Sequence, residues 1–193
     1  NMLLLGAFFS TPYWAGKDGP GKPFGKGHPP AINPDPEHFR NYVKETVKHC
    51  KGFIKYWETW NEPDVSMFWR GSPAEFANIC KVAYEAAKAN DPSCKVIVGG
   101  LTAPSWKWHE EAAKAGALKY CDIISYHEYF NASDEPEEIY QETATLLEHF
   151  RSLSEKYGNG RNVEIWNTEG GITDDSWLNG LEIKDLPPED KRG

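Results

Sequence analysis

The sequence has no excess of basic residues and no long apolar run. Lys and Arg number 21 against 29 Asp and Glu, which gives a formal net charge of −8. An acidic chain repels nucleic acid and anionic lipid, so we expect neither a nucleic acid nor a membrane as a partner. No stretch approaches the roughly 20 apolar residues of a membrane span. The apolar segment 2–9 lacks the basic flank of a signal peptide and is predicted to be a buried strand.

Cysteine is scarce, and its spacing does not suit a metal site. Cys50, Cys80, Cys94 and Cys121 form no CxxC pair, so no zinc site is expected. Cys94 and Cys121 each precede a predicted strand at the same end of a sheet, which leaves a disulfide open, although free buried thiols are favoured. GxGxxG, P-loop and HExxH motifs are also absent, so the sequence predicts neither a nucleotide cofactor nor a metalloprotease.

Strand-like and helix-like segments alternate along the chain. Strands are predicted at 3–9, 53–60, 95–100, 122–127 and 163–168, and helices at 36–51, 73–90, 108–117 and 136–157. The helical segments carry apolar residues at the spacing of one helix face, and Ser72-Pro73-Ala74-Glu75 is a capping box with proline at the first helical position. No two strands are joined by a hairpin turn, so the pattern predicts an α/β fold with a parallel sheet.

A (β/α)8 barrel of the TIM type is favoured over a doubly wound sheet, which would bind its ligand through a glycine-rich first turn that this sequence lacks. A full barrel takes about 250 residues and eight strands, whereas only about five βα units are found here. We therefore predict an incomplete barrel over residues 1–180, followed by a polar tail at 181–193. An open parallel sheet has two unpaired edges. A homo-oligomer, a complementary barrel fragment or a further part of the chain is expected to cover them.

Two glutamates stand in matched positions after strand-like segments rich in aromatic residues. Glu62 is followed by Pro63 and Glu169 by Gly170, and both following residues are expected to stop strand pairing. The two carboxylates should therefore lie at the carboxyl ends of their strands, where barrels carry their active sites. A proton donor paired with a nucleophile or base is what cleavage of a glycosidic bond requires.

Tryptophan is abundant, with eight residues, and several of them lie in predicted loops. Trp14, Trp69 and Trp177 stand beside Gly, Pro or charged residues, so a place in a sugar-stacking cleft is favoured for them, whereas core and cleft are equally open for Trp57. Glu58 is expected inside the barrel as a structural hydrogen-bonding residue. Surface positions are expected for His28, His38, His49, His109 and His149.

Four segments resemble a known family. Trp60-Asn61-Glu62-Pro63 resembles the fourth-strand acid/base signature of clan A glycoside hydrolases, which are TIM barrels, and Trp-Asn-Thr-Glu-Gly-Gly at 166–171 resembles their seventh-strand nucleophile motif. Tyr126-His127-Glu128-Tyr129 is similar to the sixth-strand motif, and the segment 10–14 to the third-strand end of family 39 members. The resemblance places strands three to seven of such a barrel in this chain, up to about residue 177.

This resemblance implies that Glu62 is the general acid/base and Glu169 the nucleophile of a retaining double displacement that cleaves β-glycosidic bonds. Asn61 would bind the sugar 2-hydroxyl, His127 would line the site near Glu62, and Tyr129 would orient Glu169. Trp14, Trp69 and Trp166 are also expected to contact the substrate. The implied partner is an oligosaccharide or glycoside, with no metal and no cofactor. Secretion would suit such an enzyme, although no signal segment is found.

Two other functions stay open at the level of the sequence. The strand count also fits a catalytically incomplete barrel that acts as a carbohydrate-binding or assembly module. A metal-dependent barrel hydrolase that uses His127 and nearby acids is the third hypothesis, and activity that is insensitive to a chelator would exclude it. His127 and Tyr129 could also be core side chains without a role at the site.

Overall fold

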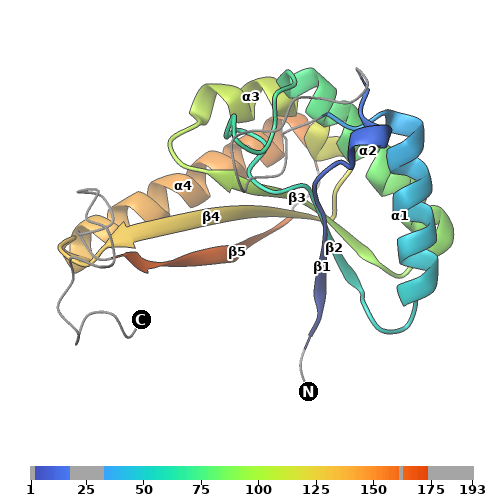
Figure 1. Cartoon of the computed structure of the whole chain (residues 1–193). Coiled ribbons are helices and arrows are strands. Elements are labelled where there is room, and N and C mark those ends of the chain that lie inside the picture. Colours follow the sequence, from blue (N-terminus) through green and yellow to red (C-terminus); the bar gives the residue numbers. More distant parts are fainter. Residues whose placement is uncertain (1–2, 18–32, 161–162, 174–193) are drawn as a thin grey trace, which may run out of the picture.

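Figure 1 shows the computed structural model of the chain, which describes residues 3–17, 33–160 and 163–173. Its strands are β1 (Leu5–Phe8), β2 (Tyr56–Thr59), β3 (Lys95–Thr102), β4 (Ile123–Asn131) and β5 (Glu164–Thr173). Its α-helices are α1 (Pro36–Cys50), α2 (Pro73–Asn90), α3 (Trp106–Lys114) and α4 (Pro136–Tyr157), and two short 3-10 helices span Tyr13–Ala15 and Ala117–Lys119.

The strands form one parallel sheet in the order in which they occur in the chain, β1-β2-β3-β4-β5. The four α-helices lie together on one face of this sheet (Figure 1). A doubly wound sheet has a reversal of strand order and helices on both faces, whereas sequential order with one helical layer is the arrangement of a (β/α) barrel. The predicted fold, an incomplete (β/α) barrel with five strands, is confirmed.

Local capping explains where α1 and α2 begin. The Asp35 carboxylate accepts hydrogen bonds from the backbone N–H groups of Glu37 at 2.9 Å and His38 at 3.1 Å. At α2, the Ser72 hydroxyl accepts from the Glu75 N–H at 3.2 Å, while the Glu75 carboxylate accepts from the Ser72 N–H at 2.8 Å. Side chains thus satisfy backbone donors that have no partner within the first helical turn. The capping box predicted at α2 is present.

An apolar core fills the space between the helices and the sheet. Phe8 of β1 and Trp57 of β2 stack with ring centroids 4.8 Å apart, and Phe8 meets Phe39 of α1 edge-on. Trp57, for which core and cleft were both open, is therefore a core residue and is 2% exposed. α2 adds the largest helical contribution, with buried residues Phe76, Ala77, Ile79, Cys80, Val82, Ala83, Ala86 and Ala87. All four cysteines are free thiols, and all but Cys50 are buried.

The opposite face of the sheet carries a polar contact instead of a helix. Successive side chains of a strand point to opposite faces, so Glu58 faces away from its neighbour Trp57 and from the helical layer. The buried Glu58 carboxylate accepts hydrogen bonds from the hydroxyls of Ser125 at 2.5 Å and Thr168 at 2.8 Å. These bonds join β2, β4 and β5 across the face of the sheet that points away from the helices, which we call the inner face. The structural role expected for Glu58 matches this geometry.

Some element bounds differ from those expected. Gly170 does not stop β5, because the strand stays paired with β4 as far as Asn131↔Thr173. Glycine lacks a side chain but keeps its N–H, so it weakens a strand without preventing the ladder. β4 likewise runs to Asn131. The tail at 181–193 and Trp177 lie outside the described residues. Among the described helices, none has the length and apolar content needed to cross a membrane.

Candidate active site

The segment that carries Glu62 leaves the end of β2 through an unusual turn. Trp60 has φ +73° and Glu62 has φ +43°, values that cost free energy for any residue other than glycine. The Trp60 indole is 1% exposed and donates its N–H to the Phe68 carbonyl at 2.9 Å. Burial of this large ring holds the turn in place. The Glu62 side chain faces β4, where its Oε1 lies 2.9 Å from His127 Nδ1.

A second anchor ties the far side of this turn to β3. The Asp64 carboxylate accepts hydrogen bonds from the Thr102 N–H at 2.9 Å and the Thr102 hydroxyl at 2.7 Å, and its Oδ2 lies 3.2 Å from His109 Nε2. Burial raises the pKa of Asp64, but the hydrogen bonds from His109 and Thr102 outweigh it, and the net pKa is lowered. The expectation that His109 is a surface residue was wrong, since it is 2% exposed.

Gly100 allows the Glu62 turn and β4 to approach each other closely. Its φ is +62°, and its N–H donates to the Ser125 hydroxyl at 2.9 Å. A Cβ atom at this position would lie 3.0 Å from the His127 ring and 3.1 Å from the Glu62 backbone nitrogen. Only glycine combines this backbone conformation with so little space. The sequence motifs around the two glutamates gave no sign of this residue.

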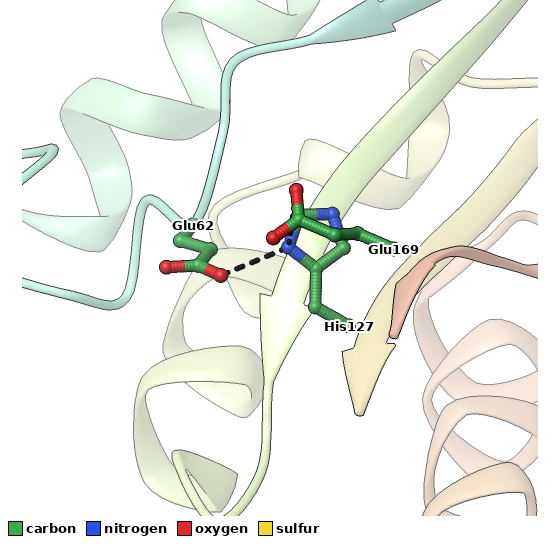
Figure 2. Close-up of side chains that lie close together, drawn as sticks. All are labelled: Glu62, His127 and Glu169. Carbon is green, nitrogen blue, oxygen red and sulfur yellow. Dashed lines mark hydrogen bonds and ion pairs between the residues drawn. The ribbon is translucent and has the colours of Figure 1, made fainter. Parts of the chain in front are cut away.

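The side chains of Glu62, His127 and Glu169 come together, although they lie on three separate segments of the chain (Figure 2). His127 Nδ1 is 2.9 Å from Glu62 Oε1 and 3.8 Å from Glu169 Oε2. One ligand atom from each residue lies within 4.8 Å of the others. The two carboxylates that were predicted from sequence thus face each other across one histidine, at the short separation associated with a nucleophile and an acid/base in glycoside hydrolysis.

His127 is buried between these acids, and its protonation follows from them. Burial lowers the pKa of His127, but the hydrogen bond to Glu62 and the charges of Glu169, Glu58 and Glu62 outweigh burial and raise it overall. An imidazolium at this position offsets part of the repulsion between the carboxylates. His127 therefore fixes the Glu62 carboxylate, and its raised pKa favours the protonated ring next to Glu169.

Tyr129 holds the second carboxylate. Its hydroxyl donates a hydrogen bond to Glu169 Oε1 at 2.6 Å. This bond and, to a lesser degree, burial and the charges of Glu169 and Glu62 raise the pKa of Tyr129 to about 12. The phenol therefore stays protonated and donates at any pH at which the protein would be assayed. Tyr129 is 52% exposed, and the Glu169 side chain is also open to solvent.

A bulge in β5 explains why Glu169 faces the site at all. Tyr126 pairs with Asn167, but the next residue, His127, pairs with Glu169. Thr168 is the extra residue, and its hydroxyl points to Glu58 on the inner face. Strict alternation would then turn Glu169 toward the helices. Because the bulge places two successive residues on one face, both Thr168 and Glu169 point inward.

The other residues expected at the site are spread over the molecule. Trp69, expected in a cleft, is 3% exposed, packs edge-on against Trp60 and Phe76, and borders a small hollow that neither Glu62 nor Glu169 lines. Trp14 is 74% exposed and lines a separate apolar hollow of about 490 Å³ at the start of α1, which none of the three clustered residues lines. The Trp14 ring therefore lies in a different hollow from those that Glu62 and Glu169 line.

Trp166 and Asn61 lie closer to the carboxylates. The Trp166 ring is half-buried on the inner face, 5.0 Å from that of Tyr56, and its N–H donates to Glu164 at 2.9 Å. Since Trp166 precedes Thr168 on the same face of β5, it lies below the carboxylates, toward the strand starts. Asn61 is partly exposed beside Glu62.

The same cluster has the composition of a small metal site. Two carboxylates and one imidazole, each offering one atom, could hold a divalent cation. His127 Nδ1 already pairs with Glu62, however, and Tyr129 donates a hydrogen bond to Glu169. Exposed acidic groups of this kind are also common without a metal.

The fold has counterparts among solved structures. A glucosidase from Croceicoccus marinus is 22% identical with a TM-score of 0.57. An α-L-arabinofuranosidase from Thermotoga maritima and a GH39 enzyme from Xanthomonas axonopodis pv. citri are each 19% identical with TM-scores of 0.56. Each likeness covers 72% of this chain. The fold is shared with glycoside hydrolases.

The shared part is only a portion of those enzymes. This chain spans 31%, 32% and 31% of the three structures, which is about a third of their length. At the level of sequence, no protein-family model and no curated protein matches the chain. The likeness therefore concerns the fold, and the chemistry has to be argued from the residues of the site.

Proposed function

We propose that this chain carries the catalytic pair of a retaining glycoside hydrolase that cleaves β-glycosidic bonds, with Glu62 as acid/base and Glu169 as nucleophile. One observation carries the proposal: the two carboxylates meet within 4.8 Å around His127. Retaining enzymes need their carboxyl groups about 5–5.5 Å apart, whereas inverting enzymes leave room for a water at about 6.5–9.5 Å. The glycosidase names of several structures with the same fold agree with this class.

In the first step, Glu169 attacks the anomeric carbon as the bond to the leaving-group oxygen breaks, and Glu62 gives its proton to that oxygen. The product is a glycosyl ester of Glu169. In the second step, Glu62 takes a proton from water, the water oxygen bonds to the anomeric carbon, and the ester bond to Glu169 breaks. Both substitutions invert the anomeric carbon, so the overall configuration is retained.

Two neighbouring side chains support these roles. The 2.6 Å hydrogen bond from Tyr129 fixes the Glu169 carboxylate for attack. His127, hydrogen-bonded to Glu62 at 2.9 Å, orients the acid/base. Asn61, beside Glu62, is placed to reach a sugar hydroxyl. No step requires a metal or a cofactor.

The test is hydrolysis of a panel of aryl β-glycosides by the full chain, beside variants of the two carboxylates. Glu169→Ala should abolish turnover. Glu62→Ala should keep measurable rates only on substrates with good leaving groups, and added azide should speed that variant by attacking the glycosyl ester in place of water. Glu148→Gln, which removes an exposed carboxylate on α4, is the matched control. Rates equal to wild type in both glutamate variants would refute the proposal.

Two outcomes would point to the other functions. Binding of glycosides without hydrolysis would favour a carbohydrate-binding or assembly module, which the five-strand sheet also permits. Hydrolysis that stops on addition of a chelator and returns with a divalent cation would favour a metal-dependent hydrolase built on Glu62, His127 and Glu169. Full activity in the presence of the chelator is the result that the double displacement requires.

A further inference from the structure

A hollow of about 550 Å³ opens beside Glu62 between β4 and the two helices that flank it. One wall is the turn from β3 to α3, with Ala103, Pro104 and Trp106, and the opposite wall is the start of α4, with Gln141, Glu142 and Thr145. Glu62 lines this hollow, whereas Glu169 lines a different, shallower depression along β5. The volume lies within the range of small-molecule sites.

We propose that this hollow binds the leaving-group sugar of the substrate and that its acidic wall selects neutral or amino sugars over uronic acids and other anionic sugars. The inference rests on the proposed function. The leaving-group oxygen must lie within hydrogen-bond reach of Glu62 to take its proton, while the anomeric carbon faces Glu169. The leaving group therefore extends to the Glu62 side of the pair, where the hollow lies.

The apolar wall is suited to a sugar ring. Trp106 is 36% exposed, so one part of its indole is free to contact a ligand. The other part is held by His149, whose ring lies edge-on at 4.7 Å, and by His109 at 6.2 Å. A fixed indole beside Pro104 offers a flat apolar surface to the C–H groups of a sugar at little cost in side-chain entropy.

The facing wall sets the charge preference. Glu128 and Glu142 both line the hollow, and no Lys or Arg is among its described lining residues. The charges of the two carboxylates interact. Burial, together with the charge of Glu142, raises the pKa of Glu128, although a hydrogen bond from Thr143 at 3.0 Å acts in the opposite direction. His127 also lines the hollow, but it is already hydrogen-bonded to Glu62 at 2.9 Å, so a sugar carboxylate would meet the charges of Glu128 and Glu142 with no Lys or Arg to offset them. An ammonium group would be attracted.

The experiment compares three disaccharides that share the sugar selected by the aryl panel and differ only in the leaving sugar: a neutral hexose, a 2-amino-2-deoxyhexose and a hexuronic acid. We expect kcat/KM for the uronic acid to be at least about tenfold below that for the neutral sugar, which corresponds to about 1.4 kcal/mol. The amino sugar should equal or exceed the neutral one. Equal rates on all three, or preference for the acid, would overturn the proposal.

Variants connect the preference to the hollow. Glu128→Gln combined with Glu142→Gln should remove most of the discrimination against the uronic acid. Trp106→Ala should lower the rate on all three disaccharides relative to the glycosyl fluoride about tenfold. Glu148→Gln removes the same charge from α4 outside the hollow and should change neither ratio. A double glutamine variant with unchanged discrimination would also overturn the proposal.

The glycosyl fluoride tests the proposed hydrolysis without the proposed subsite, because its leaving group is one atom and does not occupy the hollow. Hydrolysis of the fluoride without the expected leaving-sugar preference refutes the subsite and leaves the proposed function standing. If the fluoride is not hydrolysed, NMR titration with the methyl glycosides of the three leaving sugars still tests the subsite. The indole N–H signal of Trp106, assigned with Trp106→Phe, should shift with the neutral and amino sugars and not with the uronate. Any other pattern overturns the proposal.

Discussion

At the scale of single residues, the site is organised by hydrogen bonds to the two carboxylates. Glu62 has His127 at 2.9 Å, and Glu169 has Tyr129 at 2.6 Å. Each acid is thus oriented by a residue of β4, two positions apart on the same face of that strand. The strand that carries neither glutamate therefore sets the distance between them.

Replacing Tyr129 by phenylalanine tests this arrangement. The change removes one hydrogen bond to a charged group, worth about 1.5–3 kcal/mol, while the exposed ring stays. We expect kcat to fall about 10- to 100-fold on an aryl glycoside, with the stability of the fold nearly unchanged. Steady-state kinetics together with thermal unfolding provide the measurement. A wild-type kcat in Tyr129→Phe would show that the phenol does not act on Glu169.

A histidine outside the site should make stability depend on pH. Burial, followed by the charge of His109, lowers the pKa of His149 from 6.5 to about 4, so the folded chain holds this ring neutral. In the unfolded chain His149 binds a proton near pH 6.5, whereas in the folded chain the ring stays neutral down to about pH 4. Stability from this residue is therefore present above pH 6.5 and is lost as the pH falls toward 4. The raised pKa of His127 acts in the opposite sense, with stability lost as the pH rises.

Melting temperatures measured between pH 4 and 7 would show this effect. His149→Phe keeps a ring against Trp106 and removes the titration, so its melting temperature should fall less over this range than that of the wild type. His49→Phe, at an exposed position on α1, is the control and should follow the wild-type profile. Parallel profiles for all three proteins would contradict the assignment to His149.

At the scale of elements, the catalytic geometry depends on how the end of β3 meets the β2–α2 turn. Gly100→Ala would place a Cβ atom against His127 and the Glu62 backbone at a φ of +62°. We expect a loss of about 1–2 kcal/mol of stability from the backbone conformation and a further loss of activity from displacement of Glu62. Gly160→Ala is the control, because Gly160 has φ +69° with nothing near its would-be Cβ.

The Gly160→Ala control distinguishes the effect of backbone strain from the effect of displacing Glu62. Both alanine variants should lose similar stability in urea unfolding, and only Gly100→Ala should lose most of its turnover. If both variants kept wild-type kcat, the close approach at Gly100 would have no bearing on the site.

The anchor at Asp64 gives a second prediction at this scale. Asp64→Ala removes the acceptor of both Thr102 hydrogen bonds and leaves His109 buried without its partner. We expect a loss of about 3 kcal/mol, since breaking a buried charge-assisted network exposes the full desolvation cost of the remaining groups. Urea unfolding is the measurement, and Asp134→Ala in the β4–α4 turn is a comparison that breaks a similar acceptor away from β3. A loss below about 1 kcal/mol would exclude the anchor.

The same elements differ in how well the sequence predicts them. The capping box at Ser72 and the alternation of segments depend on local chemistry, so α2 and the parallel sheet were predictable from the chain alone. That Glu62 and Glu169 come together was also predictable from their motifs, but the expected place of Glu169 at a strand end was wrong, because β5 continues to Thr173. Gly100 and the bulge at Thr168 were not predictable, because each is defined by what a distant strand places against it. His109 looked like a surface residue because its partner Asp64 lies 45 positions earlier in the chain.

At the scale of the whole molecule, the sheet of the described residues has two end strands, β1 and β5, each hydrogen-bonded within that part of the chain to one neighbouring strand. Large apolar side chains are exposed beside or on them: Leu3 at 76%, Leu4 at 47%, Leu5 at 40% and Ile172 at 71%. Unpaired edges with exposed apolar residues favour association. We therefore expect these edges to be covered, by a second copy, by a complementary barrel fragment or by a further part of the chain.

Sedimentation velocity over a range of protein concentrations tests association with a second copy. The wild-type chain should show a concentration-dependent shift to larger species, and Leu4→Lys should reduce it by placing charge beside the β1 edge. Tyr140→Lys, which alters a 76% exposed aromatic residue on α4, is the control and should behave as the wild type. A monomer at every concentration would contradict the prediction.

The identity of strand order and chain order has a consequence for how the molecule opens. Among the described residues, the backbone ladder pairs every strand only with the strands that precede and follow it, while the Glu58 side chain also joins β2 to β4 and β5. Such a sheet can fray from either side one unit at a time, as repeat proteins do, while β3 keeps both neighbours longest. Amide hydrogen exchange should therefore be slowest in β3. The segment that carries Glu62 is anchored to that slowest strand by the hydrogen bonds from Thr102 to Asp64, whereas Glu169 belongs to an end strand, so local opening should separate the proposed nucleophile first.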